Sequence, residues 1–344
     1  MLKLLVAALV FAAAQPQPAP RAGPGKPPAV RTPPKDPAHP SILPVFDASR
    51  ATTYIFRSIY TSQQSHGNKE FDPSVEQVTF HVCVTPLSLD AEKNEAEVEV
   101  EFTGVQASWS MYGFTEKYDS TVAYRPKQTQ RPKRPGMEPD GAFINDVPLD
   151  RVLYERFKPL HGAKVHLRMT TRGEVLELKD EPLLPTSALP SISPCTLLYS
   201  LFVLPATNTE PDFNGVVRAN QQWTCEHTDA APKDGKAATV RIADYRVRTA
   251  SKGRVEAESV ARFKLPDGAA PPRGYVYEDK AAYVWDPAAG QLAAARLSVT
   301  NKSSLVVQGK DHGFSSSSEV TIDRVRSEKR RTPNSSKPAK PLQP

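Results

Sequence analysis

The sequence lacks the short motifs that mark the common enzyme classes. It contains no G-x-S-x-G nucleophile elbow, no H-E-x-x-H zinc motif, no phosphate-binding glycine loop and no dinucleotide fingerprint. Its seven histidines stand singly, among them His66, His161 and His312 in polar or turn contexts. We therefore predict a protein that is not an enzyme and has no catalytic residues, no cofactor and no metal. A hydrolase stays open as an alternative, because a nucleophile such as Cys225 can meet a distant histidine in space.

Long apolar runs are equally scarce. The run Leu4–Ala14 follows Lys3 and is 11 residues long, whereas a membrane-spanning helix needs about 20. Small residues at Ala12 and Ala14 form an A-x-A cleavage site, and no cysteine lies nearby for lipid attachment. The pattern predicts a signal peptide over 1–14 and an exported protein without a transmembrane segment, located in the periplasm, in the cell envelope or outside the cell.

Aromatic and large apolar residues are nearly absent from the two ends of the remaining chain. Residues 15–44 hold 11 of the 34 prolines, which predicts a disordered linker, and residues 324–344 form a basic tail, also predicted to be disordered. The net charge of +6 comes from these ends, because the region 45–323 is acidic. This distribution argues against nucleic acid as a partner. The tail either attracts an anionic envelope polymer or lipid headgroup, or serves only solubility.

Between the ends, apolar and polar residues alternate with the period of two that is typical of half-buried strands. The clearest hairpin signal is His161–Leu178, where Val165, Leu167 and Met169 share one face. Helix signals are few: Asp146–Lys158 can form a short helix, and Ser193–Leu204 begins with a serine cap and Pro194. The sequence predicts a mainly β fold of antiparallel sheets with one or two short helices. Further strands are expected at 77–85, 97–105, 239–249, 254–265, 274–285 and 292–307.

Four hairpin turns can be aligned on a residue expected to adopt a left-handed conformation, namely Asn94, Gly173, Gly253 and Gly290. Their spacing predicts two related lobes. Lobe one covers 45–190 and includes a proline-rich basic loop near 124–141, a connecting helix covers 191–205, and lobe two covers 206–323. A single irregular sheet is the alternative. The segment from Asp311 to Gly313 and the serines after it are predicted to form a flexible loop.

The three cysteines are Cys83, Cys195 and Cys225. In an oxidising compartment two of them can pair, and a Cys83–Cys225 disulfide would join the two lobes. His81 and His227 each lie two residues from one of these cysteines, so the two pairs together would supply four zinc ligands. Their spacing is not that of structural zinc motifs. The better interpretation is that each pair is a cysteine thiol that happens to lie beside a surface histidine. We therefore predict no metal site.

A family resemblance rests on the run 201–205 (LFVLP), on Val217, Asn220 and Trp223, and on the hairpin GAKVHLRMTTRGEVLEL. These motifs resemble a family of exported bacterial β-rich proteins of unknown function. Asn220 replaces the usual glycine of that family and fits the same left-handed turn. The family in turn resembles, in fold only, the half-barrels of periplasmic lipoprotein carriers, which hold acyl chains on a concave apolar face.

This resemblance and the alternation together predict an exported, non-enzymatic protein whose curved apolar face binds a lipid, another amphiphile or an acyl group. The same residues would also suit a closed core. The alternative function is a cell-envelope scaffold tethered through the proline-rich linker and the basic tail. The sequence specifies neither the ligand nor the oligomeric state. The apolar residues expected on the binding face are Phe80, Phe102, Val165, Leu167, Met169, Tyr283 and Trp285.

Overall fold

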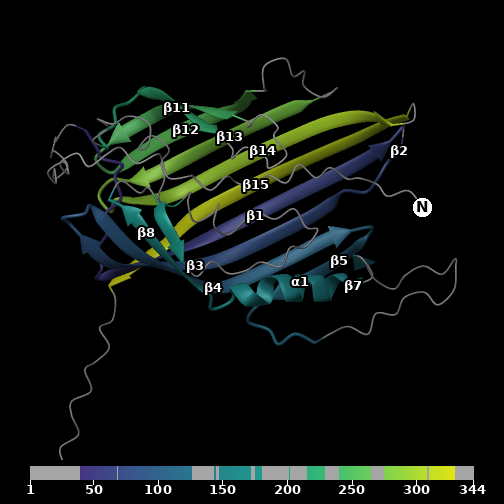
Figure 1. Cartoon of the computed structure of the whole chain (residues 1–344), viewed down its shortest axis with the longest axis horizontal. Coiled ribbons are helices and arrows are strands. Elements are labelled where there is room, and N and C mark those ends of the chain that lie inside the picture. The colour runs from purple at the N-terminus through teal and green to yellow at the C-terminus, as the bar shows by residue number, and fades with distance from the viewer. Residues whose placement is uncertain are drawn as a thin grey trace, which may run out of the picture.

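The structure is a computed structural model, and it consists mainly of long antiparallel strands with one short α-helix among the described residues (Figure 1). It describes residues 39–67, 69–125, 143–144, 147–171, 175–179, 201, 215–228, 240–264, 275–307 and 310–329. The strands are β1 (Arg50–His66), β2 (Lys69–Glu70), β3 (Ser74–Asp90), β4 (Glu95–Met111), β5 (Phe114–Asp119), β6 (Phe143–Ile144), β7 (Val147–Pro148), β8 (Lys164–Thr170), β9 (Val175–Lys179), β10 (Gln222–Thr228), β11 (Val240–Ser251), β12 (Arg254–Lys264), β13 (Val276–Asp286), β14 (Gln291–Val307) and β15 (Lys310–Lys329). The helices are α1 (Leu149–Phe157) and the 3₁₀ turn η1 (Lys158–Leu160).

The strands form one antiparallel 13-stranded sheet, which confirms the predicted fold class. The strand order is β10-β11-β12-β13-β14-β15-β1-β3-β4-β8-β9, with β2 beside β1 and β5 beside β4. The ladder between β1 and β15 covers the whole of β1 and joins the first strand of the chain to the last. The predicted division into two lobes is not confirmed, because strands from both halves belong to this continuous sheet.

The sequence placed most strands well but missed the pair at the centre of the sheet. Six strand segments were predicted in addition to the 161–178 hairpin. Each of them overlaps one of the observed strands β3, β4, β11, β12, β13 and β14. The loop predicted at Asp311–Gly313 is wrong, since β15 runs through it and through the following serines. The tail predicted from Arg324 also begins too early, because β15 continues to Lys329. These polar residues have little strand propensity of their own. They form a strand because their backbones hydrogen-bond to β1.

The predicted left-handed turns are confirmed at Asn94 and Gly290, with φ of 56° and 59°, and Asn220 has φ of 65° as expected. Gly253 does not have a left-handed φ, so that prediction is wrong. Its hairpin is closed instead by the hydroxyl of Ser251, which bonds both backbone groups of Arg254. Gly173 lies outside the described residues.

Helix α1 confirms the helix predicted within Asp146–Lys158. The second predicted helix lies outside the described residues except for Leu201, which is helical and buried. At the end of the predicted linker, the Ile42 amide donates to the Gly215 carbonyl at 2.8 Å, and Ile42 is buried. Residues 39–44 are therefore ordered, whereas the rest of the linker lies outside the described residues.

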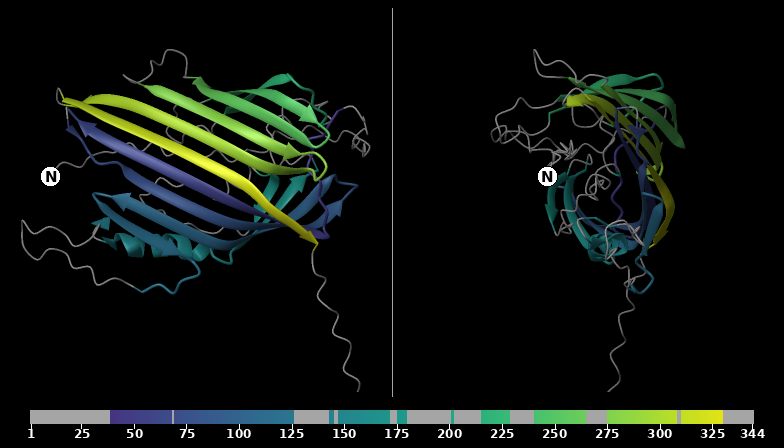
Figure 2. Two further views of the ribbon diagram at one scale, coloured as in Figure 1. Left: turned by 180° about the vertical axis from the view of Figure 1, so that it is seen from behind. Right: turned by 90° about the vertical axis from the view of Figure 1, so that its right-hand side faces the viewer.

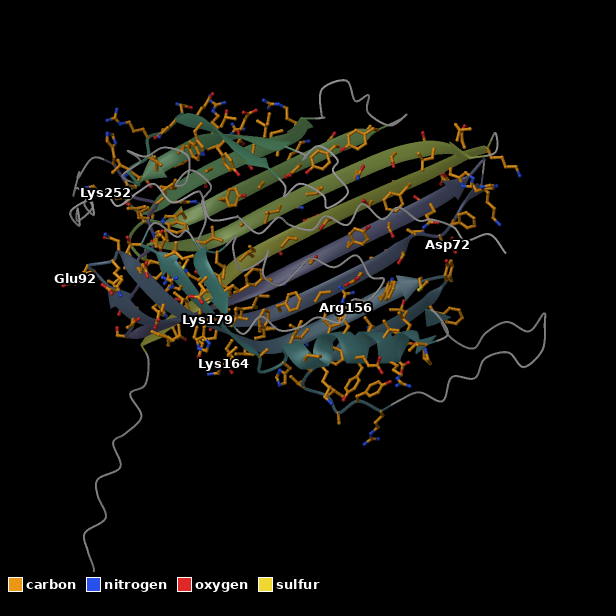
Figure 3. All side chains as sticks on the ribbon, viewed as in Figure 1. Asp72, Glu92, Arg156, Lys164, Lys179 and Lys252 are labelled. Atoms are coloured by element: carbon orange, nitrogen blue, oxygen red, sulfur yellow. The ribbon has the colours of Figure 1, made fainter. Side chains whose placement is uncertain are left out.

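The sheet is strongly curved, as the end-on view in Figure 2 shows. Helix α1 lies on its concave side, where Phe157 packs near Phe80. The antiparallel register places the turns after β3, β8, β11 and β13 at one end of the sheet, which we call the hairpin end. Figure 3 shows Glu92 and Lys252 of two of these turns at that end, and Asp72 at the opposite end, which carries β2 and is called the β2 end.

Candidate functional site

The concave face of the sheet is a continuous apolar surface. The strand register places its side chains directly opposite one another, row by row, because paired residues of neighbouring strands point to the same face. One row crosses β14, β15, β1, β3 and β4 through Ala295, Ile322, Phe56, Phe80 and Val105. All five side chains are buried. The rows join the strands of both halves of the chain into one apolar surface.

All seven predicted binding residues lie in the buried hydrophobic core of this face. Each is at most 7% exposed, so the chain itself shields them from water. The rings of Phe80 and Phe102 meet edge to face with centroids 5.9 Å apart. Val165, Leu167 and Met169 of β8 lie opposite Val100, Val98 and Ala96 of β4. Tyr283 and Trp285 lie on β13 opposite Ala295 and Leu292 of β14. Their use as a ligand-binding face stays a prediction.

Helix α1 covers part of the concave face through a buried ion pair. Arg156 of α1 lies 3.2 Å from Glu76 of β3, and their side chains are 3% and 5% exposed. Burial raises the pKa of Glu76, although Arg156 acts in the opposite direction, and burial lowers the pKa of Arg156. Figure 3 shows Arg156 over the sheet near α1. The ion pair therefore fixes the helix onto the sheet.

The concave face becomes polar toward the β2 end. The row that crosses β14, β15, β1 and β3 there consists of Asn301, Ser316, Ser62 and Ser74. Nearby, the indole of Trp109 donates to the hydroxyl of Ser74 at 2.6 Å. The concave face therefore carries polar as well as apolar side chains along the strand direction.

A second polar group lies at the hairpin end of the concave face. Arg324 is paired with Tyr54 in the β1–β15 register, and its Nη2 lies 2.6 Å from Oδ2 of Asp286. Burial acts to raise the pKa of Asp286, but bonds from Arg324 and the Ala288 and Ala289 amides outweigh it and lower the pKa. Burial raises the pKa of Tyr54 well above its usual range, so this phenol stays neutral.

Four buried side-chain polar atoms in the described part of the chain have no hydrogen-bond partner. They are Nε1 of Trp223, Nε1 of Trp285, Oδ1 of Asn301 and Nη1 of Arg324. A buried donor or acceptor without a partner is costly, and a ligand is one way to satisfy it. All four belong to strands of the curved sheet.

The convex face carries pairs of oppositely charged side chains. On β4 and β8, Lys164 lies 3.0 Å from Glu99, and Arg168 lies 3.0 Å from Glu95 and 3.2 Å from Glu177. Comparable pairs are Arg57–Asp323, Arg248–Glu258 and Arg296–Glu319. The acidic residues of these strands therefore belong to a solvated, ion-paired surface.

The Cys83–Cys225 disulfide considered above as a possibility is not formed in the structure, where Cys83 is a free cysteine. Cys83 lies on β3 and Cys225 on β10, and six strands separate β3 from β10 in the sheet order. The two histidines considered above as zinc ligands, His81 and His227, lie on these same two strands. Among the residues that the structure describes, no cluster of three or more metal-binding side chains is found.

Sequence reasoning missed the charged residues of the concave face. Glu76 stands two residues before Val78 in the alternating run of β3, so its position on the apolar side was readable from the period of two. Arg156 gave no such signal, because only the packing of α1 brings it to Glu76. Arg324 was assigned to a disordered tail and was therefore never considered as part of a site.

No known protein family and no curated protein matches the chain. Among the solved structures with a distant likeness are the following two. One, described as showing lipid–protein interactions in lipovitellin, is 11% identical, covers 84% of this chain and 26% of its own, and has a TM-score of 0.44. An outer membrane channel from Pseudomonas putida F1 is 8% identical, covers 86% of this chain and 100% of its own, and has a TM-score of 0.20.

The chain thus spans about a quarter of the lipovitellin chain. At these identities the likeness is limited to a β-rich fold. Among the described residues, α1 and η1 are both too short to cross a membrane, and no other helix qualifies as a candidate span.

Proposed function

We propose that this chain is an exported, non-enzymatic protein that binds the apolar part of a lipid or another amphiphile against its concave face. The observation that carries this proposal is the continuity of the apolar rows across the sheet. Aromatic and aliphatic side chains from both halves of the chain share one curved surface. An acyl chain is long, flexible and apolar, so it suits a curved surface of this kind.

The polar rows at the ends of this face favour an amphiphile over a purely apolar ligand. Asn301 and its serine neighbours lie toward the β2 end, and Arg324 with Asp286 lies at the hairpin end. A molecule with a polar head and an apolar tail can satisfy both kinds of surface at once. The alternative scaffold function rests mainly on the tail beyond Lys329, which lies outside the described residues.

The ligand must displace the protein atoms that now shield the concave face, because the predicted binding residues are buried in the chain itself. A lipid bound at these buried residues would itself be enclosed by protein, so it would be retained when the protein is purified without detergent. Native mass spectrometry of protein purified in this way from the cell envelope, followed by extraction and identification of bound molecules, tests the proposal. An added mass that resolves to lipid or acyl species is expected.

Two adjacent alanines of β13 offer a matched pair of variants. Ala281 is buried on the concave face, whereas Ala282 is exposed on the convex face. Ala281→Phe fills space that an acyl chain would use and is expected to abolish the added mass, whereas Ala282→Phe is expected to retain it. The smaller change Ala281→Val, expected to reduce the added mass, serves if Ala281→Phe fails to fold. A ligand-free mass for the native protein, with no uptake of added lipid, would show that the face is a closed core.

A further inference from the structure

Two of the four unpartnered buried atoms belong to residues near the hairpin end of the sheet. Nε1 of Trp285 on β13 and Nη1 of Arg324 on β15 are both N–H donors. Leaving such donors buried and unpaired is unfavourable. Two of them on one surface therefore indicate a place where an acceptor is missing.

The register and one ion pair place the residues of both donors at this end of the sheet. Trp285 lies opposite Leu292 on β14, and Arg324 lies opposite Tyr54 on β1. The Arg324 side chain spans β14, because its Nη2 reaches Asp286, the residue directly after Trp285, at 2.6 Å. Its second nitrogen, Nη1, is buried and has no hydrogen-bond partner.

We propose that Trp285 and Arg324 donate hydrogen bonds to the carboxylate of a long-chain fatty acid whose hydrocarbon chain lies along the concave face. This inference rests on the proposed function and specifies its ligand class. Both unpaired atoms are donors, so the head group must be an acceptor. A guanidinium offers N–H groups in a planar fork that fits a carboxylate.

Asp286 limits the charge that the site accepts. Its carboxylate already takes one side of the Arg324 guanidinium, so the pair has little net charge to offer. This arrangement suits a singly charged carboxylate better than a doubly charged phosphate monoester. The neutral phenol of Tyr54 adds no negative charge on the other side of Arg324.

The test measures the binding of dodecanoic acid and dodecan-1-ol to the full chain by titration calorimetry at neutral pH. The native protein is expected to bind the acid at least about 10-fold more tightly than the alcohol, because hydrogen bonds to a charged acceptor are stronger. Trp285→Phe, which removes one donor and keeps a ring, is expected to lose most of this preference. The double variant Arg324→Gln with Asp286→Asn, which removes the ion pair without leaving a lone charge, is expected to lose it as well.

Two further variants sharpen the test. Asp286→Asn alone frees the Arg324 charge and is expected to strengthen acid binding several-fold without affecting the alcohol. Trp223→Phe is the matched control, because the indole Nε1 of Trp223 is also without a partner. The Trp223 ring stacks on Tyr245 of β11, away from Arg324. This variant is expected to keep the preference. Because acid and alcohol are compared on the same variant, a partial loss of folding does not alter the ratio.

The outcomes separate this inference from the function on which it rests. If the native protein binds acid and alcohol equally, or if Trp285→Phe and the double variant keep the preference, the carboxylate site is disproved while lipid binding stands. If the native protein binds neither probe, both proposals fail.

Discussion

The two faces of the sheet use the same strands for different physical purposes. Leu167 and Arg168 are neighbours on β8, yet Leu167 is buried on the concave face and Arg168 forms two ion pairs on the convex face. The charges on the convex face neutralise one another in water, where each pair contributes little to stability. On the concave side, in contrast, Arg156 and Glu76 are buried away from water and depend on one another, whereas Arg324 and Asp286 are partly exposed.

This contrast explains why the concave face is the candidate site. Its charged residues include Glu76, Arg324 and the buried Asp279, and Arg156 of α1 packs onto it. Arg156 and Glu76 satisfy one another, whereas Arg324 keeps a donor without a partner. The first pair holds α1 in place, and the second is the one that we propose binds a ligand. Four measurements can test or refine the comparison of the two faces.

The largest effect is expected at the buried ion pair. Arg156→Met leaves the Glu76 carboxylate buried without a partner, which should lower the free energy of unfolding by about 3–5 kcal/mol. Urea denaturation measures this change. The double variant Glu76→Leu with Arg156→Met removes both charges and should recover most of the loss. A cost below about 1 kcal/mol for the single variant would mean that water reaches the pair and would contradict its burial.

Truncation on one strand compares the two faces directly. Leu167→Ala should destabilise the protein by about 2–5 kcal/mol, because it leaves a cavity under a fully buried position. Arg168→Ala, one residue further along the same strand, should change the stability much less. Chemical denaturation of both variants gives the comparison. Equal losses would show that the faces do not differ in burial as described.

The pH dependence of stability should identify Glu76. Its pKa is raised above the ordinary value of 4.5 in the folded protein, mainly by burial. At a pH just above 4.5, the carboxyl group is therefore still protonated in the folded protein but already ionised in the unfolded chain. The associated stabilisation is fully present below 4.5 and disappears as the pH rises through the folded pKa. Denaturation of the native protein and of Glu76→Gln from pH 4.5 upward should show the cost of the substitution falling with pH. A cost that grows with pH would reverse the assigned direction.

The smallest effect is expected on the convex face. Arg57 and Asp323 form an exposed pair 2.7 Å apart across β1 and β15. Arg57→Ala should reduce the free energy of unfolding by at most about 1 kcal/mol, and high salt should screen most of that difference. Unfolding at low and high ionic strength provides the measurement. A larger, salt-independent loss would place this pair in the same class as Arg156 and Glu76.

The alternation of side chains was readable from the sequence because the period of two is local. It predicted that Val165, Leu167 and Met169 share a face, and it placed the strands around Phe80 and Phe102. The turns at Asn94 and Gly290 were readable for the same reason, since the required φ depends on the residue itself. The turn at Gly253 was misread because Ser251 closes that hairpin through its hydroxyl group.

The serine-rich strand β15 was not readable, because its residues have no apolar pattern and become ordered only by pairing with β1 and β14. The same long-range pairing brings Arg324 to Tyr54 and Asp286, and the packing of α1 brings Arg156 to Glu76. The sequence by itself therefore determined the fold class, most strands and the apolar side of each strand, because these depend on local periodicity. The tertiary structure alone decided that both halves share one sheet and which charges lie on its concave face, because these depend on contacts between residues far apart in the chain.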